Sequence, residues 1–346
     1  MIRKAFLKRF AATACLAGML LITACGGVPS SLTENSRTPE PATEGPTGVF
    51  PDPLASASPA PNMDLTPDTA VNSGMGKEKA PQVETVSLTL HYITDEGYVL
   101  PVSERIEKQD GIARACLMRL IASDDTANEL RSQGLNAPIP SGTQIALSID
   151  GGEAQVNLSG MGALESGESE QSLYTAIVNT LTQFPSVQVV TITLDGAEGE
   201  TENGSIPPKK AGQYALNPEN SAIETGADGE LSALTLYFPN ESASLFVPIT
   251  RYVGGKAGLV TAISQLAAGT TLSGLRSCFP ENTLILGAAI ENGILSVNCS
   301  SDFKKVSDIS GLYSLCMQSV LLTARAFGSV DEIRFLVNGA AFAPEN

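Results

Sequence analysis

The sequence contains no tryptophan, and aromatic residues make up only 5% of its 346 positions. Sites that stack sugars or enclose cationic ligands are built mainly from large aromatic faces. A large carbohydrate-stacking site or aromatic cage is therefore not expected. Apolar residues still supply 42% of the chain, which is enough to build hydrophobic cores.

Histidine is also nearly absent, since His91 is the only one. Acyl transfer by a Ser/His/Asp or Cys/His arrangement needs a histidine base beside the nucleophile. His91 lies inside a predicted strand, and we interpret it as a structural residue. The chain has no G-x-S-x-G elbow, no Walker A loop and no dinucleotide fingerprint, and no S-x-x-K motif opens a predicted helix. We predict no catalytic residues, although the sequence does not determine whether paired carboxylates converge for glycoside cleavage.

Metal-binding patterns are missing in the same way. No C-x-x-C or H-x-x-x-H spacing offers a zinc site, and no D-x-D-x-D-G loop arranges oxygens for calcium. The acidic runs at Asp124-Asp125 and from Glu165 to Glu170 are interpreted as solvated, with the second run near a helix N-terminus. We therefore predict no cofactor and no metal.

Positive charge is scarce, with 21 lysines and arginines against 37 aspartates and glutamates. The net charge of −16 becomes −20 once the N-terminal signal described next, with its four basic residues, is removed. A surface this acidic repels phosphate backbones, so nucleic acid is not an expected partner. It also offers no electrostatic attachment to an anionic bilayer.

The N-terminus has the features of a lipoprotein signal. Basic residues between Arg3 and Arg9 precede an apolar run over 11–24, and the segment Ile22-Thr23-Ala24-Cys25 resembles the bacterial lipobox. The apolar run is short for a span of the bilayer. We predict that residues 1–24 are the signal peptide and that Cys25 is lipidated and anchors the mature chain to the outer face of a membrane. An ordinary signal with an incidental cysteine is the alternative.

Residues 25–84 are rich in Pro, Ser, Thr, Ala and Gly, with ten prolines and no apolar periodicity. Such a segment buries too little apolar surface to offset the entropy of ordering, so we predict a disordered tether. As a flexible coil it spans about 45 Å.

Apolar patterning begins at residue 85 and predicts an α+β domain over 85–196. Its expected order is ββαββαβ, a small mixed sheet with two helices on one face. The expected elements are strands at 86–93 and 98–106, a helix opened by Asp110-Gly111, strands at 143–149 and 153–158, a helix at 169–184 and a strand at 187–194.

The pattern then repeats. Residues 197–230 are polar and are predicted to be an interdomain linker, and a second domain is predicted over 231–346. LTLHYI at 88–93 recurs as LTLYFP at 234–239, and GEAQVNLS at 152–159 recurs as GILSVNCS at 293–300. In this alignment His91 corresponds to Tyr237, which favours a structural role for the histidine.

The alignment also bears on the cysteines that follow the tether. Cys299 replaces Leu158, Cys316 replaces Leu173, and Cys116 has Ala262 as its counterpart. These positions favour apolar core packing over redox or metal chemistry. Cys278 aligns with Pro138, and a Cys278–Cys299 disulfide remains an alternative that the sequence does not decide.

Taken with the lipobox and the duplication, these segments resemble the GerMN domains of GerM-type sporulation and spore germination lipoproteins. NTLTQFPSV at 179–187 carries the resemblance most clearly, and LTARAFGSV at 322–330 departs from it. The resemblance implies a fold related to ring-building motifs and a place between mother cell and forespore. It brings no known catalytic residues, and single GerMN domains also occur in envelope lipoproteins of bacteria that do not sporulate.

The sequence therefore predicts a non-enzymatic, lipid-anchored extracytoplasmic scaffold at the cell membrane. Its two domains are expected to bind envelope proteins of a sporulation or germination complex, while the lipid on Cys25 contacts the membrane. Self-association into rings is a further expectation. The alternative hypothesis is a binding module for a small molecule or a cell-wall glycan, and a hydrolase is disfavoured.

Overall fold

The computed structural model describes residues 63–64, 84–162, 164, 167–197, 215–219 and 231–344. The signal peptide, Cys25 and nearly all of the predicted tether lie outside these residues. The domain boundaries therefore stay predictions.

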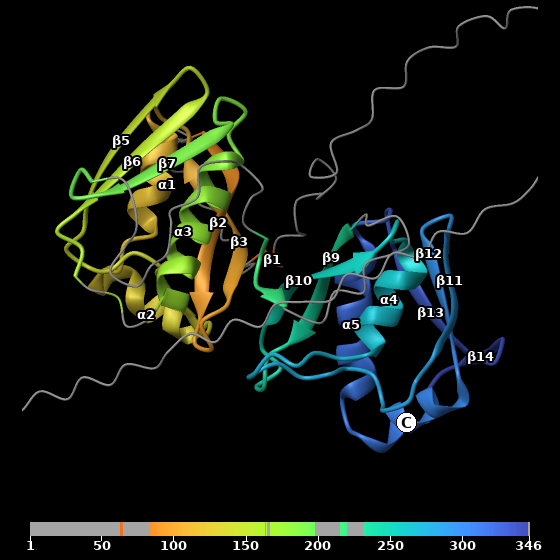
Figure 1. The fold of residues 1–346 in the computed structure, drawn as a ribbon. Coiled ribbons are helices and arrows are strands. Elements are labelled where there is room, and N and C mark those ends of the chain that lie inside the picture. Colours follow the sequence, from red (N-terminus) through yellow and green to blue (C-terminus); the bar gives the residue numbers. More distant parts are fainter. Residues whose placement is uncertain are drawn as a thin grey trace, which may run out of the picture. The chain divides into compact units, whose positions relative to one another are not determined.

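The first repeat contains the predicted elements in their predicted order, with one further helix and one two-residue strand after its first helix (Figure 1). Strands β2 (Thr85–Thr94) and β3 (Val99–Glu107) form an antiparallel hairpin, and helix α3 (Gly167–Thr182) packs against β2. The remaining elements are α1 (Ile112–Arg119), α2 (Asp124–Ser132), β4 (Leu135–Asn136), β5 (Gln144–Asp150), β6 (Glu153–Ser159) and β7 (Val189–Leu194).

The second repeat has the same plan. Strands β9 (Leu231–Pro239) and β10 (Phe246–Gly254) pair as β2 and β3 do, and helix α5 (Leu312–Ala324) packs against β9 (Figure 1). The remaining elements are α4 (Leu259–Ala267), β11 (Ile285–Glu291), β12 (Ile294–Cys299), the 3-10 helix η1 (Ser301–Asp308), β13 (Glu332–Val337) and β14 (Ala340–Phe342).

The α+β class and the duplicated ββαββαβ order are confirmed, but the single mixed sheet expected in each unit is divided in two. In the first repeat the hairpin β2–β3 belongs to one sheet, and β5, β6 and β7 form another. The second repeat divides in the same way, with β11, β12, β13 and β14 in one sheet. Within each repeat, buried residues of both sheets and of the helices form one apolar cluster, so the helices bridge two small sheets.

Apolar periodicity determines which faces are buried. Leu173, Ile177 and Leu181 recur along α3 at helical spacing, and all three are fully buried. Their counterparts Cys316 and Val320 in α5 are fully buried as well. Positions that align between the two repeats are therefore buried in the same way in both helices.

Two short strands lie in the segments that precede the repeats. β1 (Met63–Asp64) pairs in parallel with β3 at Val102 and Ser103. β8 (Pro218–Glu219) pairs in parallel with β10 at Thr250 and Arg251. Five residues of the predicted linker, 215–219, thus include a strand added to the edge of the second repeat.

Candidate functional site

Arg251 occupies an unusual position, because it lies in the apolar strand β10 and is only 6% exposed. A guanidinium removed from water is costly unless its charge and its five N–H groups are all matched. The surroundings of Arg251 therefore identify the most constrained polar site among the described residues.

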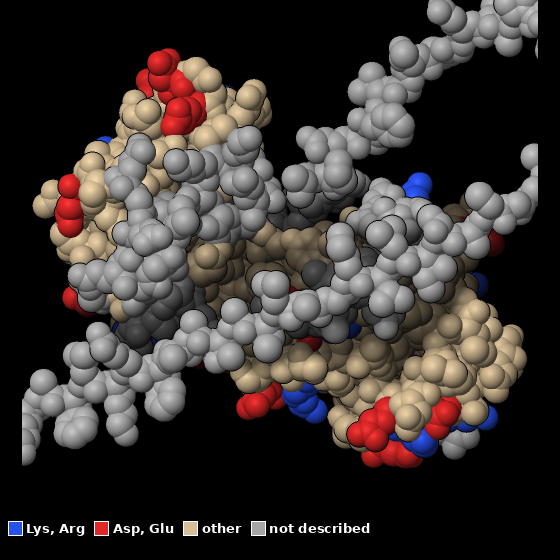
Figure 2. Space-filling view, viewed as in Figure 1, with Lys and Arg blue, Asp and Glu red and all other residues tan. Residues whose placement is uncertain are grey.

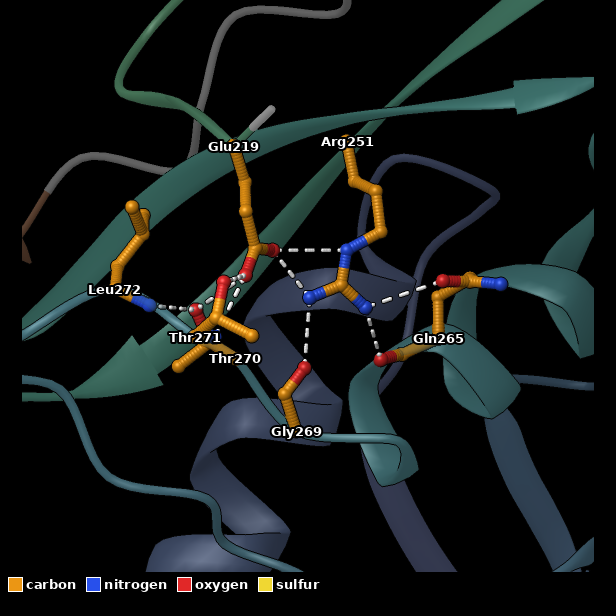
Figure 3. Close-up of polar contacts among 7 residues, drawn as sticks. All are labelled: Glu219, Arg251, Gln265, Gly269, Thr270, Thr271 and Leu272. Atoms are coloured by element: carbon orange, nitrogen blue, oxygen red, sulfur yellow. Dashed lines mark hydrogen bonds and ion pairs between the residues drawn. The ribbon is translucent and has the colours of Figure 1, made fainter. Parts of the chain in front are cut away.

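All five of those N–H groups have acceptors (Figure 3). Nε and Nη2 donate to Oε2 of Glu219, with a distance of 2.9 Å from Nε. Nη2 also donates to the carbonyl of Gly269 at 2.7 Å. Nη1 donates to the carbonyl and the side-chain Oε1 of Gln265, at 2.8 and 3.1 Å. The guanidinium therefore joins β8, β10 and the end of α4.

Glu219 on β8 is equally enclosed, at 4% exposure. Its Oε1 accepts hydrogen bonds from the backbone N–H of Thr271 at 2.7 Å and from the hydroxyls of Thr270 and Thr271 at 3.0 and 2.9 Å. Burial acts to raise the pKa of Glu219, but the hydrogen bonds from Thr271 and Arg251 outweigh it and hold the pKa below its usual value of 4.5. The carboxylate is therefore charged at neutral pH.

The first repeat has the opposite charge at the equivalent position. Glu104 faces Leu88 across its hairpin as Arg251 faces Leu234, and Leu88 and Leu234 are counterparts. Glu104 accepts a hydrogen bond from Arg119 Nε at 2.6 Å, and Arg119 corresponds to Gln265. The first repeat thus finds its counter-ion within its own helix, whereas the second repeat takes its counter-ion from the segment between the repeats.

These hydrogen bonds attach β8 to β10 and to the end of α4. They leave no polar group of Arg251 or Glu219 for proton transfer. Every Arg251 donor is directed at an acceptor of the same chain, and the pKa of Glu219 is held below its usual value. Sequence reasoning assigned 197–230 to a polar linker and so missed Glu219. The available signal was Arg251 itself, a charged residue in the apolar run FVPITRYV that required a buried partner.

The residues singled out from the sequence are not brought together. Cys25 lies outside the described residues. His91 is buried on β2, and its Nδ1 lies 3.1 Å from the hydroxyl of Thr180 on α3. Burial lowers the pKa of His91 to about 3, so the ring is neutral. The backbone N–H of His91 also bonds to Thr180, as that of Tyr237 bonds to Thr323, which matches the structural interpretation of this histidine.

The four cysteines that follow the tether are buried and free. The Cys278–Cys299 disulfide left open by the sequence is not formed. Burial raises the pKa of Cys116 to about 11 and that of Cys299 to about 12, so these thiols stay protonated at neutral pH. A protonated, buried thiol is a poor nucleophile and metal ligand.

One motif was overlooked because its helix was not predicted. The 3-10 helix η1 opens with Ser301-Asp302-Phe303-Lys304, an S-x-x-K sequence. Ser301 and Lys304 are both exposed, whereas Phe303 is buried in the core. The motif thus lacks the enclosed surroundings that activate a catalytic serine, and its spacing places Phe303 in an aromatic cluster with Phe335.

The described residues can also be compared with the usual features of metal and small-molecule sites. Within the described ranges, no cluster of three or more His, Cys, Asp or Glu residues is placed to hold a metal ion. A shallow depression at residues 325–331 is lined by a single loop rather than by groups converging from several elements, which gives little support to the small-molecule hypothesis.

Among the residues that the structure describes, no helix combines the length and apolar character needed to cross a bilayer.

The chain is similar in sequence and in structure to a protein associated with spores. Over 268 residues the chain is 26% identical to the spore germination protein GerM of Bacillus subtilis (strain 168), covering 74% of this chain and 72% of that protein. Its structure is similar to that of the tandem GerMN domains of the sporulation protein GerM from Bacillus subtilis, with a TM-score of 0.54 and 25% identity. That match covers 74% of this chain and 92% of the solved one.

The family comparison agrees with both. The family named Germane, described as sporulation and spore germination, matches residues 64–200 and 235–342. These two ranges correspond to the two repeats and make up more than two thirds of the sequence. The chain therefore belongs to the Germane family of sporulation and spore germination proteins, and it carries two GerMN domains in tandem.

Proposed function

We propose that this protein is a non-enzymatic, lipid-anchored scaffold outside the cytoplasm, whose GerMN repeats bind other envelope proteins during sporulation or spore germination. The observation that carries the proposal is the tandem GerMN fold, because GerM of Bacillus subtilis, which the chain resembles over most of its length, is a spore germination protein. The lipid on Cys25 holds the repeats at the membrane.

The surface supports contacts with proteins. Among the described strands, β11 pairs only with β12 and so ends its sheet. Leu284 and Leu286, at this edge, are 65% and 52% exposed. Leu284 has Gln144 as its counterpart in the first repeat, and Leu286 lies at a register shift between Ile285 and Gly287. An apolar sheet edge without lysine or proline is suited to pairing with another chain.

The charge distribution disfavours nucleic acid. On the face shown in Figure 2, Lys and Arg side chains lie in small separate groups, many beside Asp or Glu. Nucleic-acid binding needs a continuous basic surface that neutralises several phosphates. The excess of acidic over basic residues in the whole chain agrees with protein partners instead.

Deletion of the gene from a spore-forming source organism tests the proposal. We expect the yield of heat-resistant spores to fall and at least one envelope complex to lose its normal position, because a scaffold acts through its partners. An unmodified copy of the gene should restore both. Normal spores together with a correctly placed envelope complex would rule out the sporulation role.

A further inference from the structure

We propose that residues 215–219, here called the clasp, join the two GerMN repeats into one structural body. The clasp includes β8 and is fixed to the second repeat by the buried pair of Glu219 and Arg251. Two residues earlier, Asn217 contacts the first repeat. The clasp therefore contacts both repeats.

The Asn217 side chain acts as one rung of a β ladder. The backbone N–H of Val99 on β3 donates to its Oδ1 at 2.8 Å, and its Nδ2 donates to the carbonyl of Val99 at 2.8 Å. The same Nδ2 donates to the carbonyl of Pro248 on β10 at 2.7 Å. A single amide thus satisfies both backbone groups of Val99 in the first repeat and one carbonyl in the second.

The backbone of Asn217 is adapted to this role. Its φ is 45°, in the left-handed region that asparagine tolerates better than most residues. Its carbonyl accepts a hydrogen bond from the N–H of Thr250 at 3.3 Å, which continues the pairing between β8 and β10. Asparagine therefore provides both the backbone conformation and the bridging amide.

Contacts between the hairpin turns reinforce the clasp. Tyr98 precedes β3 as Leu245 precedes β10, and each side chain packs against the other repeat. Tyr98 borders the core of the second repeat, and Leu245 is buried in the core of the first. The Tyr98 hydroxyl donates to the carbonyl of Ser273 at 2.6 Å, and Asn240 Nδ2 donates to Glu96 Oε1 at 3.2 Å.

This exchange has the character of an isologous interface, in which equivalent positions of two units meet each other. Isologous contacts close on themselves, whereas head-to-tail contacts propagate into rings or filaments. The hairpin turns around Tyr98 and Leu245 are thus already occupied within one chain. Any assembly of several copies must use other surfaces, such as the β11 edge.

The clasp is tested by cutting the chain beside it. A specific protease site is inserted within residues 200–210 of the mature lipidated chain, which is purified in detergent and cleaved. We expect the two fragments to stay together at micromolar concentration in size-exclusion chromatography, because clasp and hairpin turns still join them. Separation of the unmodified fragments would overturn the proposal.

The variant Asn217→Gly tests the side-chain amide alone, because glycine adopts the same φ without strain and only the side chain is lost. Loss of its two hydrogen bonds to Val99 should weaken fragment association roughly tenfold to a hundredfold. Asn338→Gly is the matched control, because Asn338 is exposed in the β13–β14 turn and has a φ of 50°. Equal affinities for Asn217→Gly and the unmodified chain would contradict the clasp.

Discussion

Replacing Arg251 with methionine is expected to lower the free energy of unfolding by about 3–5 kcal/mol. Methionine fills similar space but leaves the carboxylate of Glu219 buried without a counter-ion, and the carbonyl of Gly269 loses its side-chain donor. Chemical denaturation of the unmodified and variant proteins, followed by circular dichroism, measures the change.

A second substitution separates the ion pair from general packing. Glu219→Gln in the Arg251→Met background removes the buried charge, so the double variant should be more stable than Arg251→Met alone. Arg334→Met is the matched control, because Arg334 and Glu332 form an exposed pair and its loss should cost less than about 1 kcal/mol. A cost below 1 kcal/mol for Arg251→Met would mean that the buried pair does not hold β8 in place.

The same pair gives stability a defined dependence on pH. The pKa of Glu219 is lower in the folded chain than its usual value of 4.5. The stability that it contributes is therefore fully present above this value and is lost as pH falls through the folded pKa. In acid titrations, unfolding free energy should consequently decline less steeply for Glu219→Gln than for the unmodified protein.

The second large effect is expected at Cys25. Replacing Cys25 with serine should abolish incorporation of a labelled fatty acid almost completely, because only the thiol of the lipobox cysteine accepts the diacylglyceryl group that carries it. Metabolic labelling with an alkyne fatty acid, followed by fluorescent detection on a denaturing gel, measures it.

Cys15 provides the control for this experiment. Cys15 follows Thr13 and Ala14 as Cys25 follows Thr23 and Ala24, but Cys15 lies inside the apolar run, whereas Cys25 lies at its end. Cys15→Ser should therefore keep full labelling. If Cys25→Ser remained labelled, the lipobox interpretation would be wrong and the chain would reach the membrane by another route.

Much of the fold could be predicted because its signals are local. The alternation from Val86 to Ile93 predicts β2, and Leu173, Ile177 and Leu181 predict the buried face of α3. The duplication supports these assignments, since each predicted element appears twice. The family resemblance stated from the sequence is confirmed by the matching ranges.

The elements that were missed bury few residues of their own. α2 has Leu130 as its one buried residue, and its N-terminus depends on the polar cap Ser123. In the 3-10 helix η1, Phe303 and Val306 are buried among polar neighbours. Such segments are indistinguishable from loops by periodicity, because their order comes from tertiary contacts.

The clasp was missed for a different reason. Glu219 and Arg251 are separated by 32 positions, and Asn217 and Val99 by 118. Asn217 and Glu219 lie in a polar segment, so in the sequence they look like solvated residues. Their roles become visible only once their partners are known. The division of each predicted sheet into two likewise depends on strand pairing over long separations, which composition does not reveal.

The scaffold role is tested most directly by photo-crosslinking in living, sporulating cells. A photoreactive amino acid is placed at Leu284 on the exposed edge of the second repeat, and for comparison at Gln144, its counterpart in the first repeat. The account predicts a covalent adduct with another envelope protein at position 284 that appears during spore development and is weaker at position 144. The absence of a protein adduct at both positions, in cells where the protein is present and lipidated, would contradict it.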